Sequence, residues 1–280
     1  MSTTMKQGAP VIVLTGASRG IGLGVACLLA ASEVPLLLTA RGERRLQRAQ
    51  AFLAEQGTRV EVHACDVADE PAMGAALDRA AAMGPIGAVL NNAGVLEPIS
   101  PIREIDIAKF EAHLRTNVTG VLVGTKAALL RKQAHVPLRV VNISSGAATH
   151  GYRSWAAYCA SKAAVNLLTE VAAAEAGDQV SVVAVAPGII ETQMQRTIRS
   201  TSEDRFPDVG KFHELKKAGA LLHPVDAAVP LGWLLRSAPM DLSGQFLDAR
   251  DDALQRRLPA PDARLVERAK AWFDRLEAKD

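Results

Sequence analysis

Tyr158 and Lys162 are two residues whose types and spacing could perform acid–base chemistry. They stand four residues apart in a segment of helical pattern, so their side chains lie on one face of that helix. A free tyrosine has a pKa of about 10 and is a poor catalyst at neutral pH. A neighbouring ammonium group favours the phenolate and brings that pKa toward the working range. An exposed tyrosine–lysine pair is the alternative, and the pair alone does not exclude it.

Ser145 could complete the same site. It lies thirteen residues before Tyr158, at the end of a predicted strand. There its hydroxyl could donate a hydrogen bond to a carbonyl oxygen as negative charge develops on that oxygen. The three side chains together predict a site for carbonyl chemistry.

A glycine-rich loop follows the first predicted strand and runs Thr15-Gly16-Ala17-Ser18-Arg19-Gly20-Ile21-Gly22. Its spacing is GxxxGxG, which differs from the GxGxxG of the common dinucleotide fingerprint. Glycine lets the backbone turn sharply and approach a pyrophosphate, and the following helix N-terminus offers free N–H groups. A plain strand–helix turn is the alternative. The flanking strand and helix favour a nucleotide site.

Charge at the end of the second predicted strand bears on which cofactor binds. Folds that take NAD place a carboxylate there for the ribose 2′-hydroxyl, whereas NADP requires cations for the 2′-phosphate. Here the strand ends at Arg41 with no carboxylate, and Arg19 could converge on the same phosphate. An ordinary solvated Arg41 is the alternative. We predict NADP(H).

Short apolar runs alternate with longer segments of helical period. The predicted strands are Val11–Thr15, Pro35–Thr39, Val60–Ala64, Ala88–Leu90, Leu138–Ile143, Ser181–Ala186 and Gln245–Leu247. The predicted helices are Ile21–Ala31, Glu43–Gln56, Glu70–Ala82, Ile107–Lys132, Ala156–Ala176 and Pro230–Arg236. This alternation predicts an α/β class, doubly wound Rossmann-type fold, with a seven-stranded parallel sheet and helices on both faces. We expect residues 1–280 to form a single NADP-binding domain.

Two segments depart from the alternation. Residues 192–223 are long and polar, and we expect a substrate loop there. Residues 252–280 form a C-terminal extension that ends in a helical pattern at Ala263–Lys279. That helix could cap the body or pack on a partner chain.

Bulk properties exclude several classes of protein. The 32 basic and 30 acidic residues give no reason to expect nucleic acid or an anionic membrane as partner. No apolar run reaches the roughly 18 residues of a membrane span. The first nine residues lack an apolar signal core and are predicted to be a short frayed leader. The three cysteines show no CxxC spacing and predict a reduced, cytoplasmic protein with no metal site.

Six motifs occur in order along the chain, and together they resemble the short-chain dehydrogenase/reductase superfamily over roughly Val11 to Leu247. They are the glycine-rich loop, Asn91-Asn92-Ala93-Gly94, Asn117, Ser144-Ser145, Tyr158-Cys-Ala-Ser-Lys162 and Pro187-Gly188. The resemblance implies that Tyr158 donates the proton while Lys162 lowers its pKa and binds the nicotinamide ribose. It further implies that Ser145 orients the carbonyl and that Asn117 holds a water in the proton relay.

The resemblance also implies the cofactor contacts and the assembly. Asn91, Ala93 and Gly94 would lie beside the adenosine half, and Asp66 and Val67 would contact adenine. Pro187, Gly188, Ile190 and Thr192 would lie against the nicotinamide and its phosphate. The pro-S hydride would then move from C4 of NADPH to the carbonyl. A homodimer or homotetramer is expected, and the helical patterns 107–132 and 156–176 are apolar on more than one face.

Three segments, 93–98, 154–158 and 184–195, are similar to fungal and bacterial benzil reductases and to sepiapterin reductase. Benzil reductases reduce one carbonyl of a vicinal diketone and form (S)-benzoin. An apolar, partly aromatic pocket would suit flat substrates, and its predicted lining is Val95, Leu96, Ala147, Tyr152, Trp155, Ile189 and Met194. Asp248 would either anchor a pterin or be a turn residue, and His150 would either reach the pocket or be a loop histidine.

The substrate therefore stays open at this point. A bulky or aromatic 1,2-diketone is the first hypothesis, with a pterin side chain, a steroid or a sugar as alternatives. A catalytically idle NADP-binding sensor or scaffold is a hypothesis of another class. The presence of Ser145, Tyr158 and Lys162 together argues against it, since an idle site does not require all three.

Overall fold

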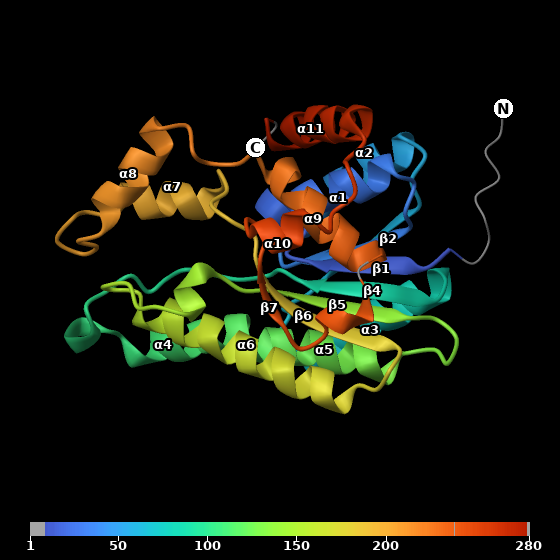
Figure 1. Ribbon diagram of the computed structural model, residues 1–280, viewed down its shortest axis with the longest axis horizontal. Coiled ribbons are helices and arrows are strands. Elements are labelled where there is room, and N and C mark those ends of the chain that lie inside the picture. The colour runs from blue at the N-terminus through green and yellow to red at the C-terminus, as the bar shows by residue number, and fades with distance from the viewer. Residues whose placement is uncertain (1–8, 238, 279–280) are drawn as a thin grey trace.

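Seven parallel strands form one sheet in the part of the chain that the structure describes. The computed structural model describes residues 9–237 and 239–278 (Figure 1). The strands are β1 (Val11–Thr15), β2 (Leu36–Ala40), β3 (Val60–Ala64), β4 (Ile86–Asn91), β5 (Leu138–Ile143), β6 (Val180–Ala186) and β7 (Phe246–Asp248). Their order is β3-β2-β1-β4-β5-β6-β7. The β1–β2 pair stays in register, with Leu14 opposite Leu38, whereas the register of β1 against β4 shifts between Val11 and Ile12. The predicted doubly wound fold is confirmed. The predicted leader falls, apart from Ala9, outside the described residues.

Helices cover both faces of the sheet (Figure 1). One face carries α1 (Gly20–Ala31), α2 (Glu43–Glu55), α9 (Pro224–Arg236) and α11 (Ala263–Glu277). The other carries α3 (Glu70–Met83), α5 (Gly120–Leu130) and α6 (Ala156–Glu175). Alternate residues of β1 therefore enter two separate cores: Ile12 and Leu14 on the first face, Val11 and Val13 on the second. This double burial explains why a central strand such as β1 is almost wholly apolar, whereas β3 at the edge of the sheet also carries Glu61 and His63.

From β1 the chain adds strands toward one edge of the sheet, as far as β3. It then crosses back to β4 on the other side of β1 and adds strands toward the opposite edge, so the connections leaving β1 and β4 run to opposite sides. In open parallel sheets, a ligand crevice forms outside the carboxyl ends of the strands at such a point. The topology therefore fixes where a cofactor cleft can form.

The predicted helix 107–132 is not continuous. It consists of α4 (Ile107–Leu114), a π-helical turn (Arg115–Thr119) and α5. The wide turn carries Asn117, whose amide bonds both backbone groups of Val95, with each N···O distance at 2.8 Å. A regular α-helical period does not anticipate this inward turn, and such turns are frequent at functional sites.

The predicted helix Pro230–Arg236 is too short. Helix α9 begins at Pro224, and the side chain of His223 accepts a hydrogen bond from the Val225 N–H at 3.1 Å. Pro224 takes the first helical position, where a missing N–H is tolerated. Pro230 lies inside the helix rather than at its start.

The prediction of a loop over 192–223 is also wrong in part. This segment contains α7 (Gln193–Ser200) and α8 (Val209–Lys217). The segment is mostly polar, and its few large buried side chains are Ile198 in α7, Phe206 between the two helices and Phe212 in α8. The C-terminal extension contains α10 (Asp252–Gln255) and α11. Helix α11 caps the body, because Ala269, Phe273 and Leu276 are buried in the core that α1 shares.

The described residues show neither a membrane-spanning helix nor a metal-binding cluster. None of the helices there is both long and apolar enough to span a membrane. Within residues 9–237 and 239–278, no group of three or more His, Cys, Asp or Glu side chains is placed to hold a metal ion.

Candidate active site

A cleft of about 880 Å³ lies at the carboxyl ends of the strands. It is lined by the loops that follow β1, β2, β3, β4, β5 and β6, together with residues of α6, α7 and α8. The cleft is therefore where the topology predicts it.

The glycine-rich loop forms the floor of this cleft at the N-terminus of α1. Gly16 and Gly20 have positive φ angles of 63° and 54°, which favour glycine. A Cβ on Gly22 would lie 2.4 Å from the Gly16 carbonyl oxygen, so that position permits no side chain. Gly16, Ser18, Arg19, Gly20 and Ile21 line the cleft, while Gly22 lies behind them.

Cations gather at one end of the cleft. Arg41 and Arg19 line it, as the sequence predicted, and Arg45 joins them. Arg45 was missed by sequence reasoning, although its spacing of four residues from Arg41 was visible. Asp66 and Val67 line the neighbouring wall, where Asp66 accepts a hydrogen bond from the Ala68 N–H at 3.0 Å.

The predicted catalytic side chains meet at the other end. Ser145 follows β5, Tyr158 and Lys162 come from the first two turns of α6, and all three line the cleft. The Lys162 Nζ donates to the Ile143 carbonyl at 2.7 Å and lies 5.7 Å from the centre of the Tyr158 ring. A side-chain hydrogen bond joins Ser145 to Tyr158.

Burial dominates the ionisation of this pair. It lowers the pKa of Lys162 to about 8. It raises the pKa of Tyr158, and the hydrogen bond with Ser145 offsets only part of that rise. The sequence led us to expect a tyrosine pKa lowered by Lys162; burial has the opposite and larger effect here. Tyr158 is consequently protonated at neutral pH and is able to donate a proton.

Two predicted asparagines do not line the cleft. Both oxygen and nitrogen of the Asn117 amide are used by Val95, and its side chain is fully buried. The Asn91 amide donates to the Asn142 amide oxygen at 2.8 Å, also inside the protein. Its neighbour Asn92 does line the cleft and donates to the Thr15 carbonyl at 2.9 Å. Sequence reasoning gave Asn92 no role, although it belongs to the motif.

The remaining residues that were predicted to contact the cofactor all line the same cleft. Ala93 and Gly94 line the cleft after β4, and Pro187, Gly188, Ile190 and Thr192 line it after β6. The Thr192 hydroxyl also accepts from the Gln195 N–H at 3.5 Å, which caps α7.

An aromatic wall stands beside the catalytic end. The predicted substrate residues Val95, Leu96, Ala147, Tyr152, Trp155, Ile189 and Met194 all line the cleft, as does His150. Trp155 stacks on Phe206 with ring centres 4.9 Å apart and planes 10° apart, and Phe212 lies 5.4 Å from Trp155. Phe206 and Phe212 were missed because their segment was expected to be a loop.

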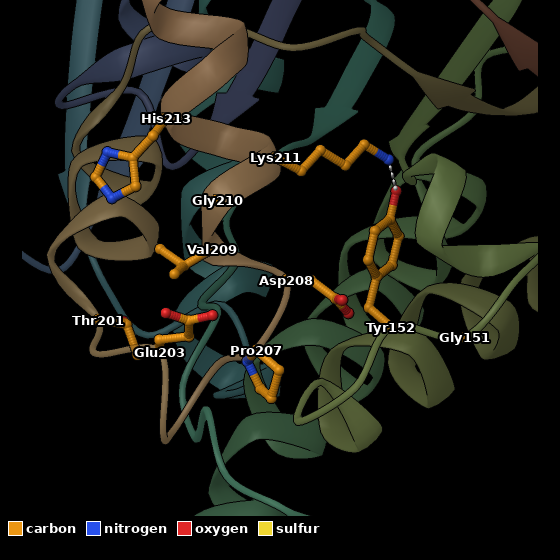
Figure 2. A pocket seen from close by; sticks show the side chains of 10 residues that line it. All are labelled: Gly151, Tyr152, Thr201, Glu203, Pro207, Asp208, Val209, Gly210, Lys211 and His213. Atoms are coloured by element: carbon orange, nitrogen blue, oxygen red, sulfur yellow. Dashed lines mark hydrogen bonds between the residues drawn. The ribbon is translucent and has the colours of Figure 1, made fainter.

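The segment carrying those phenylalanines is fastened to the body by polar contacts. Arg153 pairs with Asp208 at 2.5 Å, and Lys211 donates to the Tyr152 hydroxyl at 3.3 Å. Figure 2 shows the second contact at the edge of a smaller pocket, with Tyr152 on one side and α8 on the other. Tyr152 and Lys211 line both this pocket and the cleft, so they separate the two.

Asp248 does not line the cleft. Its carboxylate accepts from the Arg250 guanidinium at 3.0 and 2.6 Å and from the Arg250 N–H at 2.9 Å. This pairing holds the pKa of Asp248 below its usual range. Arg250, rather than Asp248, lines the cleft.

Comparison with known proteins decides the family. The family profile described as short chain dehydrogenase matches residues 10–203. The chain belongs to the short-chain dehydrogenase family.

Two relatives and one solved structure are similar to this chain over most of its length. A benzil reductase ((S)-benzoin forming) of Saccharomyces cerevisiae is 35% identical over 259 residues, covering 87% of this chain and 97% of the relative. The sepiapterin reductase of Mus musculus is 34% identical over 259 residues, with 87% and 98% covered. A crystal structure of a short-chain dehydrogenase/reductase from Saccharomyces cerevisiae has a TM-score of 0.81 at 30% identity, with 89% and 100% covered. The chain therefore belongs to a family of oxidoreductases. Its relatives include a benzil reductase and a sepiapterin reductase, the two kinds of enzyme that the sequence resembles.

Proposed function

We propose that this family member is an NADPH-dependent carbonyl reductase that reduces one carbonyl of a bulky or aromatic 1,2-diketone. One observation carries the proposal: a single cleft has Ser145, Tyr158 and Lys162 beside an aromatic wall at one end and an arginine cluster at the other. The first end suits proton donation to a carbonyl oxygen. The second suits a phosphate-bearing ribose.

The residues present fit the cofactor. The glycine floor lets a pyrophosphate approach the N-terminus of α1, and Arg19, Arg41 and Arg45 would hold the 2′-phosphate. Lys162 would bind the nicotinamide ribose, and Pro187, Ile190 and Thr192 would lie against the nicotinamide. When bound, NADPH supplies the hydride.

The chain's own groups would manage the proton. Ser145 donates a hydrogen bond that orients the substrate carbonyl, and the Tyr158 hydroxyl donates its proton to the carbonyl oxygen. Lys162 places an ammonium beside the phenol. Both polar atoms of the Asn117 amide are bonded to Val95, so this side chain is not free to hold the relay water that the family resemblance implies.

Two features support the proposed substrate class: the aromatic wall of the cleft and the pairing of Asp248 with Arg250. Flat rings would lie against Trp155 and Tyr152, which agrees with the similarity to benzil reductases. A pterin would instead require a free carboxylate, and Arg250 occupies the one on Asp248. The diketone is therefore favoured over the pterin.

The pKa of Lys162 predicts a pH dependence. Burial places this pKa at about 8, so the ammonium is present below that pH and is lost above it. We expect kcat/KM for NADPH, which reports groups of the cofactor-free protein, to be nearly level up to about pH 7, to be halved near pH 8 and to fall further above it. Initial rates measured at saturating ketone and varied NADPH, across that pH range, check this. A rate that rises steadily with pH would contradict it.

NADPH oxidation at 340 nm with a set of carbonyl compounds tests the proposed function. The set contains benzil, 1-phenyl-1,2-propanedione, sepiapterin and simple ketones. We expect the two aromatic diketones to give the highest kcat/KM. Turnover of sepiapterin or a simple ketone alone would refute the diketone, and tight NADPH binding without turnover would favour a sensor or scaffold.

We also propose that the protein forms a homodimer or homotetramer and works in a reducing compartment, the cytoplasm. Exposed apolar side chains on α5 and α6 support the assembly: Leu122, Leu130, Leu167 and Val171 are 49 to 71% exposed. The cysteines support the compartment, since Cys27, Cys65 and Cys159 are unpaired.

A further inference from the structure

A buried histidine lies next to the catalytic tyrosine without lining the cleft. His113 lies in the last turn of α4 and is 1% exposed. Its ring lies 6.2 Å from the Tyr158 ring in an edge-to-face arrangement. Sequence reasoning gave this residue no role, and the proposed mechanism does not use it.

The neighbours of His113 fix its protonation state. The Nδ1 atom lies 2.8 Å from the Glu97 carbonyl oxygen, which can only accept, so Nδ1 carries the proton. The Nε2 atom lies 2.9 Å from the Asn117 amide nitrogen. That atom is the nitrogen because the other amide atom accepts from the Val95 N–H. Nε2 must therefore accept, and the ring is the neutral Nδ1–H tautomer.

The same ring touches the helix of the catalytic tyrosine. Nε2 lies 2.9 Å from the Ser161 hydroxyl, and that hydroxyl lies 2.9 Å from the Tyr158 carbonyl oxygen. Ser161 sits between Tyr158 and Lys162 along α6. His113 therefore joins three parts of the protein: the cleft wall at Val95–Glu97, the π-helical turn and α6.

We propose that His113 is a positioning residue, which acts through Asn117 and Ser161 to hold Tyr158 and the Val95–Glu97 wall in place for carbonyl reduction. The inference rests on the proposed function for its kinetic consequence, and on hydrogen-bond geometry alone for the state of the ring. The Ser161 hydroxyl has a single proton, which it donates to the Tyr158 carbonyl or to Nε2, while the Asn117 amide donates to Nε2 in both cases. Hydrogen bonds made inside the protein in this way make a side-chain network rigid.

The electrostatics agree with a neutral ring. Burial lowers the pKa of His113, the hydrogen bond to Glu97 opposes this, and the charge on Lys162 adds to the lowering. A second proton on Nε2 would also face the Asn117 amide nitrogen, donor against donor.

Three substitutions of His113 distinguish the contributions of its two ring nitrogens. His113→Phe keeps a ring and removes both. His113→Gln places an amide oxygen near the position of Nε2, and His113→Asn places an amide nitrogen near that of Nδ1. We expect His113→Phe to lower kcat at least about tenfold, with NADPH affinity within about twofold of the wild type. His113→Gln should restore most of the loss, and more than His113→Asn does.

Thr58→Val is the matched control. Thr58 is also buried, and its hydroxyl donates to the Ala30 carbonyl at 2.9 Å outside the cleft lining. This change should lower the unfolding temperature without lowering kcat. If His113→Phe folds and keeps kcat within twofold, or if Gln and Phe lose equally, the positioning role is refuted.

Imidazole ¹⁵N NMR of the wild-type protein gives a readout that does not depend on turnover. We expect the Nδ1–H tautomer of His113 at neutral pH. An Nε2–H tautomer or an imidazolium would overturn the inferred network. Failure to reduce any ketone would instead refute the proposed function and leave the tautomer result standing.

Discussion

Tyr158→Phe is expected to lower kcat for diketone reduction about 100- to 10,000-fold, the usual contribution of a positioned general acid. The change removes the hydroxyl that hydrogen-bonds with Ser145 and leaves the ring in place. NADPH affinity should stay nearly constant, because the arginine cluster and glycine floor are untouched. Steady-state kinetics with a fluorescence titration of NADPH measure both quantities.

The chain supplies a matched control for that change. Tyr152 is its other tyrosine and also lines the cleft, where its hydroxyl accepts from Lys211. Tyr152→Phe removes a hydroxyl from the same cleft and should lose far less activity. Equal losses in the two variants would mean that Tyr158 is not the proton donor.

Arg41→Ala is expected to weaken NADPH binding about 10- to 100-fold and to leave NADH binding almost unchanged. A hydrogen bond to a charged group contributes about 1.5–3 kcal/mol, and only NADPH carries the 2′-phosphate. Dissociation constants of both nucleotides for the wild type and the variant measure the difference.

Arg44→Ala serves as the control for Arg41, because Arg44 is a nearby exposed arginine that does not line the cleft. It should change neither dissociation constant appreciably. If Arg41→Ala weakened NADH as much as NADPH, the choice of cofactor would not depend on this cation. Arg45→Ala should resemble Arg41→Ala, since both residues line the same end.

The strands were predictable because burial on both faces leaves a nearly continuous apolar run, as in Val11–Thr15. The helices α7 and α8 were not, because their segment buries only a few widely spaced residues, such as Phe206 between the helices and Phe212 in α8. Their burial depends on Trp155, which lies far away in sequence. The spacing of apolar residues within the segment itself does not reveal that contact.

The candidate site divides in the same way. Residues in a loop directly after a strand, such as Ser145 and Arg41, line the cleft, as their motifs predicted. Asn117 lies in a π-helical turn and Asp248 at the end of β7, and their side chains are bonded to Val95 and Arg250 instead of reaching the cleft. The direction of the Tyr158 pKa shift also depends on burial, which spacing does not give.

Reduction of benzil with NADPH deuterated at the pro-S position of C4 tests the central claim most directly. We predict benzoin that carries one deuterium at its carbinol carbon, as mass spectrometry and NMR would show. Absence of turnover, or product without deuterium at that carbon, would contradict the account.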